Sequence, residues 1–113
     1  MATHHIITSS ISLSLGHAGL PSVSLRKLQF VPSGSWTGSI TIQGRIKESG
    51  VAYTSLPYYR INVDGVASDN TLVSTTITGS SLITVDDSGL ELTVSASSVT
   101  GGLMNIWQQS VIG

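Results

Sequence analysis

The sequence contains no cysteine among its 113 residues, which excludes disulfide bonds, thiolate zinc sites and a cysteine nucleophile. Charged residues are also scarce, at 10% of positions against about 25% in typical domains. The net charge of −1 gives no overall attraction to nucleic acid or to an anionic membrane. No stretch approaches the roughly 20 apolar residues of a membrane span. No basic residue precedes Arg26, so we expect no signal peptide.

Motifs for catalysis and for bound cofactors are missing as well. There is no G-x-S-x-G nucleophile elbow, no phosphate-binding glycine loop and no calcium-loop spacing. The histidines at positions 4, 5 and 17 lack the spacing of a metal site. Asp64, Asp86 and Asp87 lie where turns favour aspartate. We therefore predict a non-enzymatic protein with no catalytic residue, no cofactor and no metal.

Alternation of apolar and hydroxyl side chains is the dominant pattern in the sequence. In residues 6–15, one parity carries Ile7, Ile11, Leu13 and Leu15, while the other carries Thr8, Ser10, Ser12 and Ser14. A period of two residues indicates a half-buried strand, here with a hydroxyl-rich outer face. Similar alternation recurs in residues 36–47, 58–63 and 90–97, and further strands are predicted at 22–31, 72–78, 81–86 and 103–112.

The spacing of turn residues completes the fold prediction. Glycine, proline and aspartate clusters separate these segments, at 16–21, 32–35, 48–50, 64–65, 86–89 and 101–102. A parity change near Arg26 predicts a β-bulge or a strand crossing between sheets. Gly44 on an inward parity predicts room for a bulky neighbour or a local bend. We predict one domain over residues 1–113, an all-β antiparallel sandwich, jelly-roll-like, with seven to nine short strands.

The last predicted strand, residues 103–112, has apolar side chains on both parities. Leu103 and Trp107 share one parity, and Met104 and Ile106 share the other. Such a strand is either central in a sheet or covered by another subunit. Trp107 therefore fits a core position or an interface position.

Charge is distributed unevenly along the chain. All five basic residues precede residue 61, whereas five of the six acidic residues follow it. This asymmetry predicts either head-to-tail contacts between copies or merely loops of different composition.

Two segments resemble small structural proteins of tailed bacteriophages. The first is FVPSGSWTGSITIQG at residues 30–44, a tryptophan-containing strand rich in threonine and serine. The second is DSGLELTVSASS at residues 87–98, followed by the Gly101–Gly102 turn and a closing strand. The resemblance covers about two thirds of the chain and lies in composition and turn placement.

This resemblance implies a virion component made in the host cytoplasm and placed on the capsid surface. Its implied role is a head decoration (cement) protein whose partners are the major capsid protein and copies of itself, as a homo-oligomer or bound to the capsid lattice. Neither nucleic acid nor a membrane is an expected partner. The alternatives are a tail or fibre-associated subunit and a carbohydrate-binding β-sandwich, in which exposed aromatic rings stack on sugars.

The residues expected at the capsid interface follow from this role. Aromatic side chains are the usual anchors of an interface, so we expect Trp36, Tyr58 and Trp107 to act as anchors. His4 and His5 near the N-terminus, with Val111 and Ile112 near the C-terminus, are expected to reach neighbouring subunits.

Overall fold

A computed structural model describes residues 3–17, 24–46, 49–73, 76–86 and 90–112. The described residues form eight strands in one sheet, and all strand pairs are antiparallel. The strands are β1 (Thr3–Ile7), β2 (Ser12–His17), β3 (Ser24–Ile46), β4 (Thr54–Ser55), β5 (Tyr58–Val63), β6 (Val66–Val73), β7 (Ser81–Asp86) and β8 (Leu90–Ile112). The prediction of an all-β antiparallel fold is confirmed. None of the described residues forms a helix that is long and apolar enough to cross a membrane.

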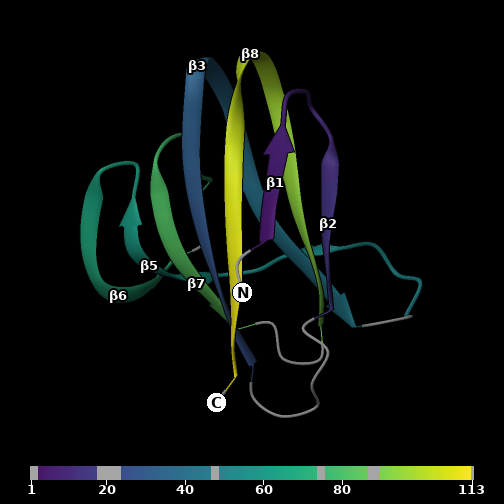
Figure 1. Ribbon diagram of the computed structural model, residues 1–113. Coiled ribbons are helices and arrows are strands. Elements are labelled where there is room, and N and C mark those ends of the chain that lie inside the picture. The colour runs from purple at the N-terminus through teal and green to yellow at the C-terminus, as the bar shows by residue number, and fades with distance from the viewer. Residues whose placement is uncertain (1–2, 18–23, 47–48, 74–75, 87–89, 113) are drawn as a thin grey trace.

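Two strands of 23 residues each, β3 and β8, organise the whole sheet. They pair along their entire length, from Ser24 opposite Ile112 to Ile46 opposite Leu90. The register is irregular only around residues 33–39 of β3. Both strands bend over at this place, at the top of Figure 1. The turns predicted at 32–35 and 101–102 are therefore bends within continuous strands, and the prediction of short strands is wrong for β3 and β8.

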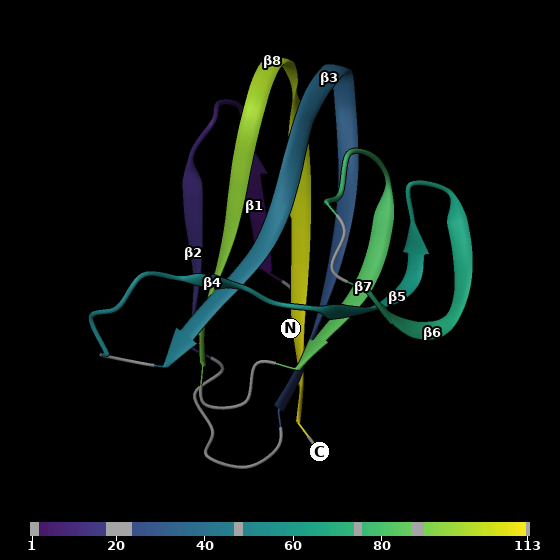
Figure 2. The ribbon, with the colours of Figure 1, turned by 180° about the vertical axis from the view of Figure 1, so that it is seen from behind.

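Bending of β3 and β8 folds the single sheet into two layers (Figure 2). The first layer contains β1, the C-terminal half of β8, the N-terminal half of β3, and then β7, β5 and β6. The second layer contains β2, the N-terminal half of β8, the C-terminal half of β3, and β4. The two layers thus arise from one folded sheet in the described residues, without the two separate sheets of a jelly roll.

Glycine permits the close approach of the two strands at the bend. Gly102 has φ +70°, in the left-handed region, and a Cβ there would lie 2.3 Å from the backbone nitrogen of Trp36. Any larger residue would clash with the backbone of β3 and would also pay for the unfavourable φ.

Apolar side chains from the inner faces of both layers form the core. In β3, Leu28 and Phe30 of the first layer and Ile40 and Ile42 of the second are almost fully buried. The other buried apolar residues are Ile7, Leu15, Tyr58, Val63, Ile77, Ile83, Val85, Leu92, Val94, Ala96, Met104 and Ile106. Because the inner parity is the same on both sides of the bend, a single alternating pattern supplies both halves of the core.

Two predictions about the N-terminal third are wrong. The strand expected over residues 6–15 is divided into β1 and β2, which lie in different layers, and Ile11 between them is 43% exposed. No bulge occurs near Arg26, because the β3–β8 register is unbroken from Ser24 to Ser33. Arg26 itself faces inward, with 2% exposure. The parity change was inferred from the apolar residues, which occupy odd positions at Val23 and Leu25 and even positions at Leu28 and Phe30.

The remaining predictions have mixed outcomes. Asp64 and Gly65 form the expected β5–β6 turn, with φ 51° and 83°. Of the expected strand 72–78, Leu72 and Val73 belong to β6, and Ile77 forms an isolated bridge to Ile40. Residues 74–75 lie outside the described residues. Gly44 makes room for a bulky neighbour, since a Cβ would lie 2.5 Å from Cδ1 of Leu56. The turns predicted at 16–21, 48–50 and 86–89 fall partly outside the described residues.

Candidate binding surface

The outer faces of the two layers differ in chemical character. The second layer presents mainly hydroxyl and amide side chains, including Ser12, Ser14, Thr41, Gln43 and Ser95, which alternate with core residues. The first layer presents large apolar side chains: Ile6 is 51% exposed, Val31 38% and Trp107 42%. The hydroxyl-rich face predicted from the sequence is thus found on the second layer. Exposed apolar side chains that adjoin one another mark the first layer as the candidate binding face.

Strand register brings these three side chains together. Ile6 and Val31 lie opposite Asn105 from either side, on β1 and β3 respectively. Trp107 lies two residues further along β8, on the same face. We call Ile6, Val31 and Trp107 the apolar strip; it crosses β1, β8 and β3.

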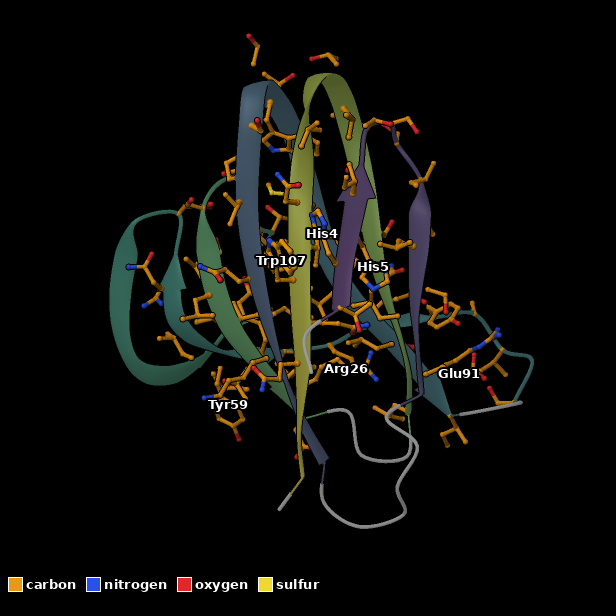
Figure 3. The ribbon with its side chains drawn as sticks, in the orientation of Figure 1. His4, His5, Arg26, Tyr59, Glu91 and Trp107 are labelled. Carbon is orange, nitrogen blue, oxygen red and sulfur yellow. The ribbon has the colours of Figure 1, made fainter. Side chains whose placement is uncertain are left out.

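The Trp107 ring is supported by a stacked histidine. His4 lies directly opposite Trp107, and the two ring centroids are 4.0 Å apart with an interplanar angle of 8°. Figure 3 shows these side chains next to each other on β1 and β8. His4 Nε2 lies 2.9 Å from Asn105 Oδ1, and Asn105 Nδ2 donates to the Val31 carbonyl at 3.1 Å. Because Asn105 donates through its nitrogen, its oxygen accepts, and His4 Nε2 is the donor.

A shallow groove begins on the other side of Trp107. The register places Trp107, Gln29, Leu82 and Asn62 in one row across β8, β3, β7 and β5. The groove has a volume of about 270 Å³ between Trp107 and Leu82, and an adjoining hollow of about 180 Å³ continues toward Asn62. We call it the amide groove, because Gln29 and Asn62 line it together with Gln109; Lys27 and Ser80 also border it.

Beneath this face, Arg26 connects the two layers through hydrogen bonds. Its Nη1 donates to the Leu15 carbonyl on β2 at 2.8 Å and to Gln108 Oε1 at 3.2 Å. The Gln108 amide oxygen is thereby committed, and Gln108 Nε2 lies 3.1 Å from His5 Nε2. His5 must accept this bond through an unprotonated nitrogen. Burial, then the charges of His4 and Arg26, lower the pKa of His5 below its ordinary value of 6.5.

Two other polar clusters have structural partners. Glu91 Oε2 lies 3.4 Å from Arg45 Nη2 and accepts a hydrogen bond from the Tyr53 hydroxyl at 3.1 Å. The Arg45 guanidinium also lies 4.4 Å from the centre of the Tyr53 ring. Two of the five basic residues thus have partners within the chain, since Arg26 is buried and Arg45 pairs with Glu91.

Asp64 links the β5–β6 turn to the segment that precedes β7. Its carboxylate accepts hydrogen bonds from the Thr78 backbone at 3.1 Å, from the Thr78 hydroxyl at 3.0 Å and from the Gly79 backbone. The position of Asp64 in the β5–β6 turn matches the turn role expected from the sequence, whereas its contacts with Thr78 and Gly79 were not predicted. Among the described residues, no three histidine, aspartate or glutamate side chains are placed to hold a metal ion.

The structure places the residues predicted to bind partners in different environments. Trp107 and His4 form the centre of the candidate surface, so the core alternative for Trp107 is wrong. Tyr58 is 1% exposed and belongs to the core, so it lines no surface. Trp36 is half-buried against the core and donates from Nε1 to the Thr78 carbonyl at 3.2 Å.

The terminal residues that were expected to reach neighbouring subunits lie in strands β1 and β8. His5 faces inward from β1, where it meets Gln108. Val111 and Ile112 pair through their backbones with Leu25 and Ser24, and their side chains lie outside the described part of the structure. These residues therefore belong to the sheet.

Sequence reasoning missed the residues of the amide groove. Gln29, Leu82 and Asn62 come from three different strands, and none belongs to a recognisable motif. Only the register of β3, β7 and β5 places them in a row. The one available signal was the outward parity of Gln29 beside Leu28 and Phe30.

Comparison with known proteins identifies a structural relative. No protein-family model matches the chain, and no curated protein matches it. Among solved structures, the crystal structure of the SPBc2 prophage-derived protein YomS is similar, with a TM-score of 0.54 and 19% sequence identity. The similarity covers 98% of this chain and 96% of that chain. The two proteins share a fold over nearly their whole length.

Proposed function

We propose that this chain is a non-enzymatic structural protein of a bacteriophage particle, and specifically a capsid decoration protein. The observation that carries the proposal is the fold shared with a prophage-derived protein along nearly the full length of both chains. The resemblance of residues 30–44 and 87–98 to phage structural proteins supports the same role. In this role the chain acts at the capsid surface, with the major capsid protein and copies of itself as partners.

The candidate surface has the properties that attachment to a protein lattice requires. Interfaces of this kind bury on the order of 800 Å² per partner, with an aromatic anchor surrounded by polar groups. Trp107 supplies the anchor, Ile6 and Val31 extend the apolar area, and Asn105 and Lys27 lie at its borders. Many copies bound across capsid junctions would stabilise the shell, because each copy must be released before the subunits separate.

A non-enzymatic role agrees with the state of the described acidic groups. Glu91 is held by Arg45 and Tyr53, and Asp64 is held by the backbone groups of Thr78 and Gly79. Both carboxylates therefore serve the fold.

Co-sedimentation with capsids that lack the chain tests this proposal. We expect saturable binding at a fixed copy number per shell and greater resistance of the decorated shell to heat. An Ile6→Asp variant places a charge in the apolar strip, and its affinity for capsids should fall at least about tenfold. Urea unfolding of the variant verifies that it remains folded.

The matched control is Ile46→Asp, which places the same charge at an apolar residue that is 68% exposed outside the strip. Its capsid affinity should match that of the unmodified chain. Absence of binding to the capsids would refute the decoration role and direct the same assay to phage tails. Equal losses for both variants would refute the assignment of the surface.

A further inference from the structure

We propose that the amide groove is a saccharide-binding site, with a sugar ring packed against Trp107. This goes beyond the decoration role, whose proposed contact surface is the apolar strip; the groove shares Trp107 with that strip. The groove is bounded by Trp107 on one side and Leu82 on the other, with Gln29 between them. Neighbouring strands are about 4.8 Å apart, so these walls stand about 10 Å apart across β3. That separation admits a flat ring standing on edge between them.

The ring of Trp107 is prepared for stacking. One of its faces is covered by His4, which lies on β1. The groove lies on the opposite side, toward β3 and β7. The His4–Asn105–Val31 hydrogen bonds fix the histidine, and the stacked histidine limits rotation of the indole. An aromatic face that is already ordered loses little conformational entropy when a ligand packs on it, and its negative potential attracts the polarised C–H groups of a pyranose.

The polar lining matches sugar hydroxyls. Gln29, Gln109 and Asn62 each carry a donor and an acceptor, as a hydroxyl does, and Ser80 extends the series along the adjoining hollow. Lys27 adds a cation at the border. None of the groove residues described is a carboxylate, so the site also tolerates an acidic sugar. An apolar wall with a few placed polar groups is the usual composition of a small-molecule site.

Titration with maltotriose, cellotriose and chitotriose tests this assignment. The chain carries Trp36→Phe, so that Trp107 is the only tryptophan, and its emission is followed. We expect a saturable change with at least one trisaccharide at millimolar concentration. Gln29→Ala in the same background should weaken that binding by about fivefold to tenfold. Gln43→Ala, the same change on the outer face of the second layer, should leave it unchanged.

Binding is also followed by amide chemical shifts, with Trp107→Ala as the second variant. Loss of the ligand-induced shifts in this variant supports the site. Shifts that persist in Trp107→Ala place binding elsewhere and overturn the proposal, as does the absence of a saturable response to all three trisaccharides. Capsid binding is measured separately with Ile6→Asp, so failure of the saccharide site is distinguishable from failure of the decoration role.

Discussion

His4 and His5 are neighbours in sequence but serve different surfaces, because adjacent strand residues point to opposite faces. His4 supports Trp107 on the outer face, while His5 faces inward and accepts a hydrogen bond from Gln108. Sequence reasoning named both residues as candidates for contact with neighbouring subunits. It could not assign their contacts, because Asn105 and Gln108 lie about 100 positions away and meet them only through the β1–β8 register.

Protonation of His5 should weaken the native state. The native pKa of His5 is lowered, so the unfolded chain binds more protons than the native chain. Stability is therefore complete above the unfolded pKa of about 6.5 and is lost as the pH falls below it. The loss stays well under the limit of about 1.4 kcal/mol per pH unit for one proton, because the ring is partly exposed.

Urea unfolding of the unmodified chain and of His5→Gln, between pH 7.5 and 5, measures this effect. Glutamine still offers Gln108 an acceptor but does not titrate in this range. The free energy of unfolding of His5→Gln should therefore depend less on pH over this interval. Identical pH profiles for the two proteins would show that His5 does not contribute.

At the scale of elements, the sequence predicted the positions where the chain changes direction better than it predicted strand ends. Glycine and proline near residues 32–35 and 101–102 indicated turns, and the sheet does bend there. Periodicity contains no information on which backbone hydrogen bonds continue around the bend. Consequently two long strands were interpreted as four short ones. The buried position of Arg26 was not predicted either. Its charged head is buried because Leu15 and Gln108 accept its hydrogen bonds, and these partners come from other strands.

Gly102→Ala should destabilise the bend much more than an equivalent change elsewhere. The new Cβ would meet the Trp36 backbone, and the left-handed φ adds its own cost, so we expect a loss of about 2 kcal/mol or more. Gly50 is a close control, with φ +73° but no atom within 4 Å of its Cβ position. Gly50→Ala should cost about 1 kcal/mol in the same urea experiment. Equal losses would mean that packing at the bend is unimportant.

On the scale of the whole molecule, β8 is the strand on which the fold depends. It pairs with β1, β2 and β3 and contributes core residues to both layers. The sequence indicated this position, since apolar side chains on both parities of residues 103–112 predicted a strand that is central or covered. β8 proves to be central, and the outward-facing Trp107 adjoins the candidate surface.

A chain that ends at residue 89 should not fold. Removal of β8 leaves β1 and β2 without their partner and exposes the inner face of β3. We expect this fragment to show no cooperative urea transition by near-ultraviolet circular dichroism. Addition of a peptide with residues 90–112 should restore the transition, since the missing strand supplies only non-covalent contacts. A cooperative transition in the fragment alone would show that β8 is dispensable.

The central place of β8 also has a consequence for synthesis in the cell. Ribosomes make proteins from the N-terminus, so β1, β2 and β3 are all made before the strand that joins them. Until β8 has left the ribosome, the nascent chain carries apolar strands with unsatisfied edges and can close neither layer. Closure of the two layers is therefore delayed until residues 90–112 have left the ribosome, and in that interval chaperones that bind extended apolar segments can bind the nascent chain.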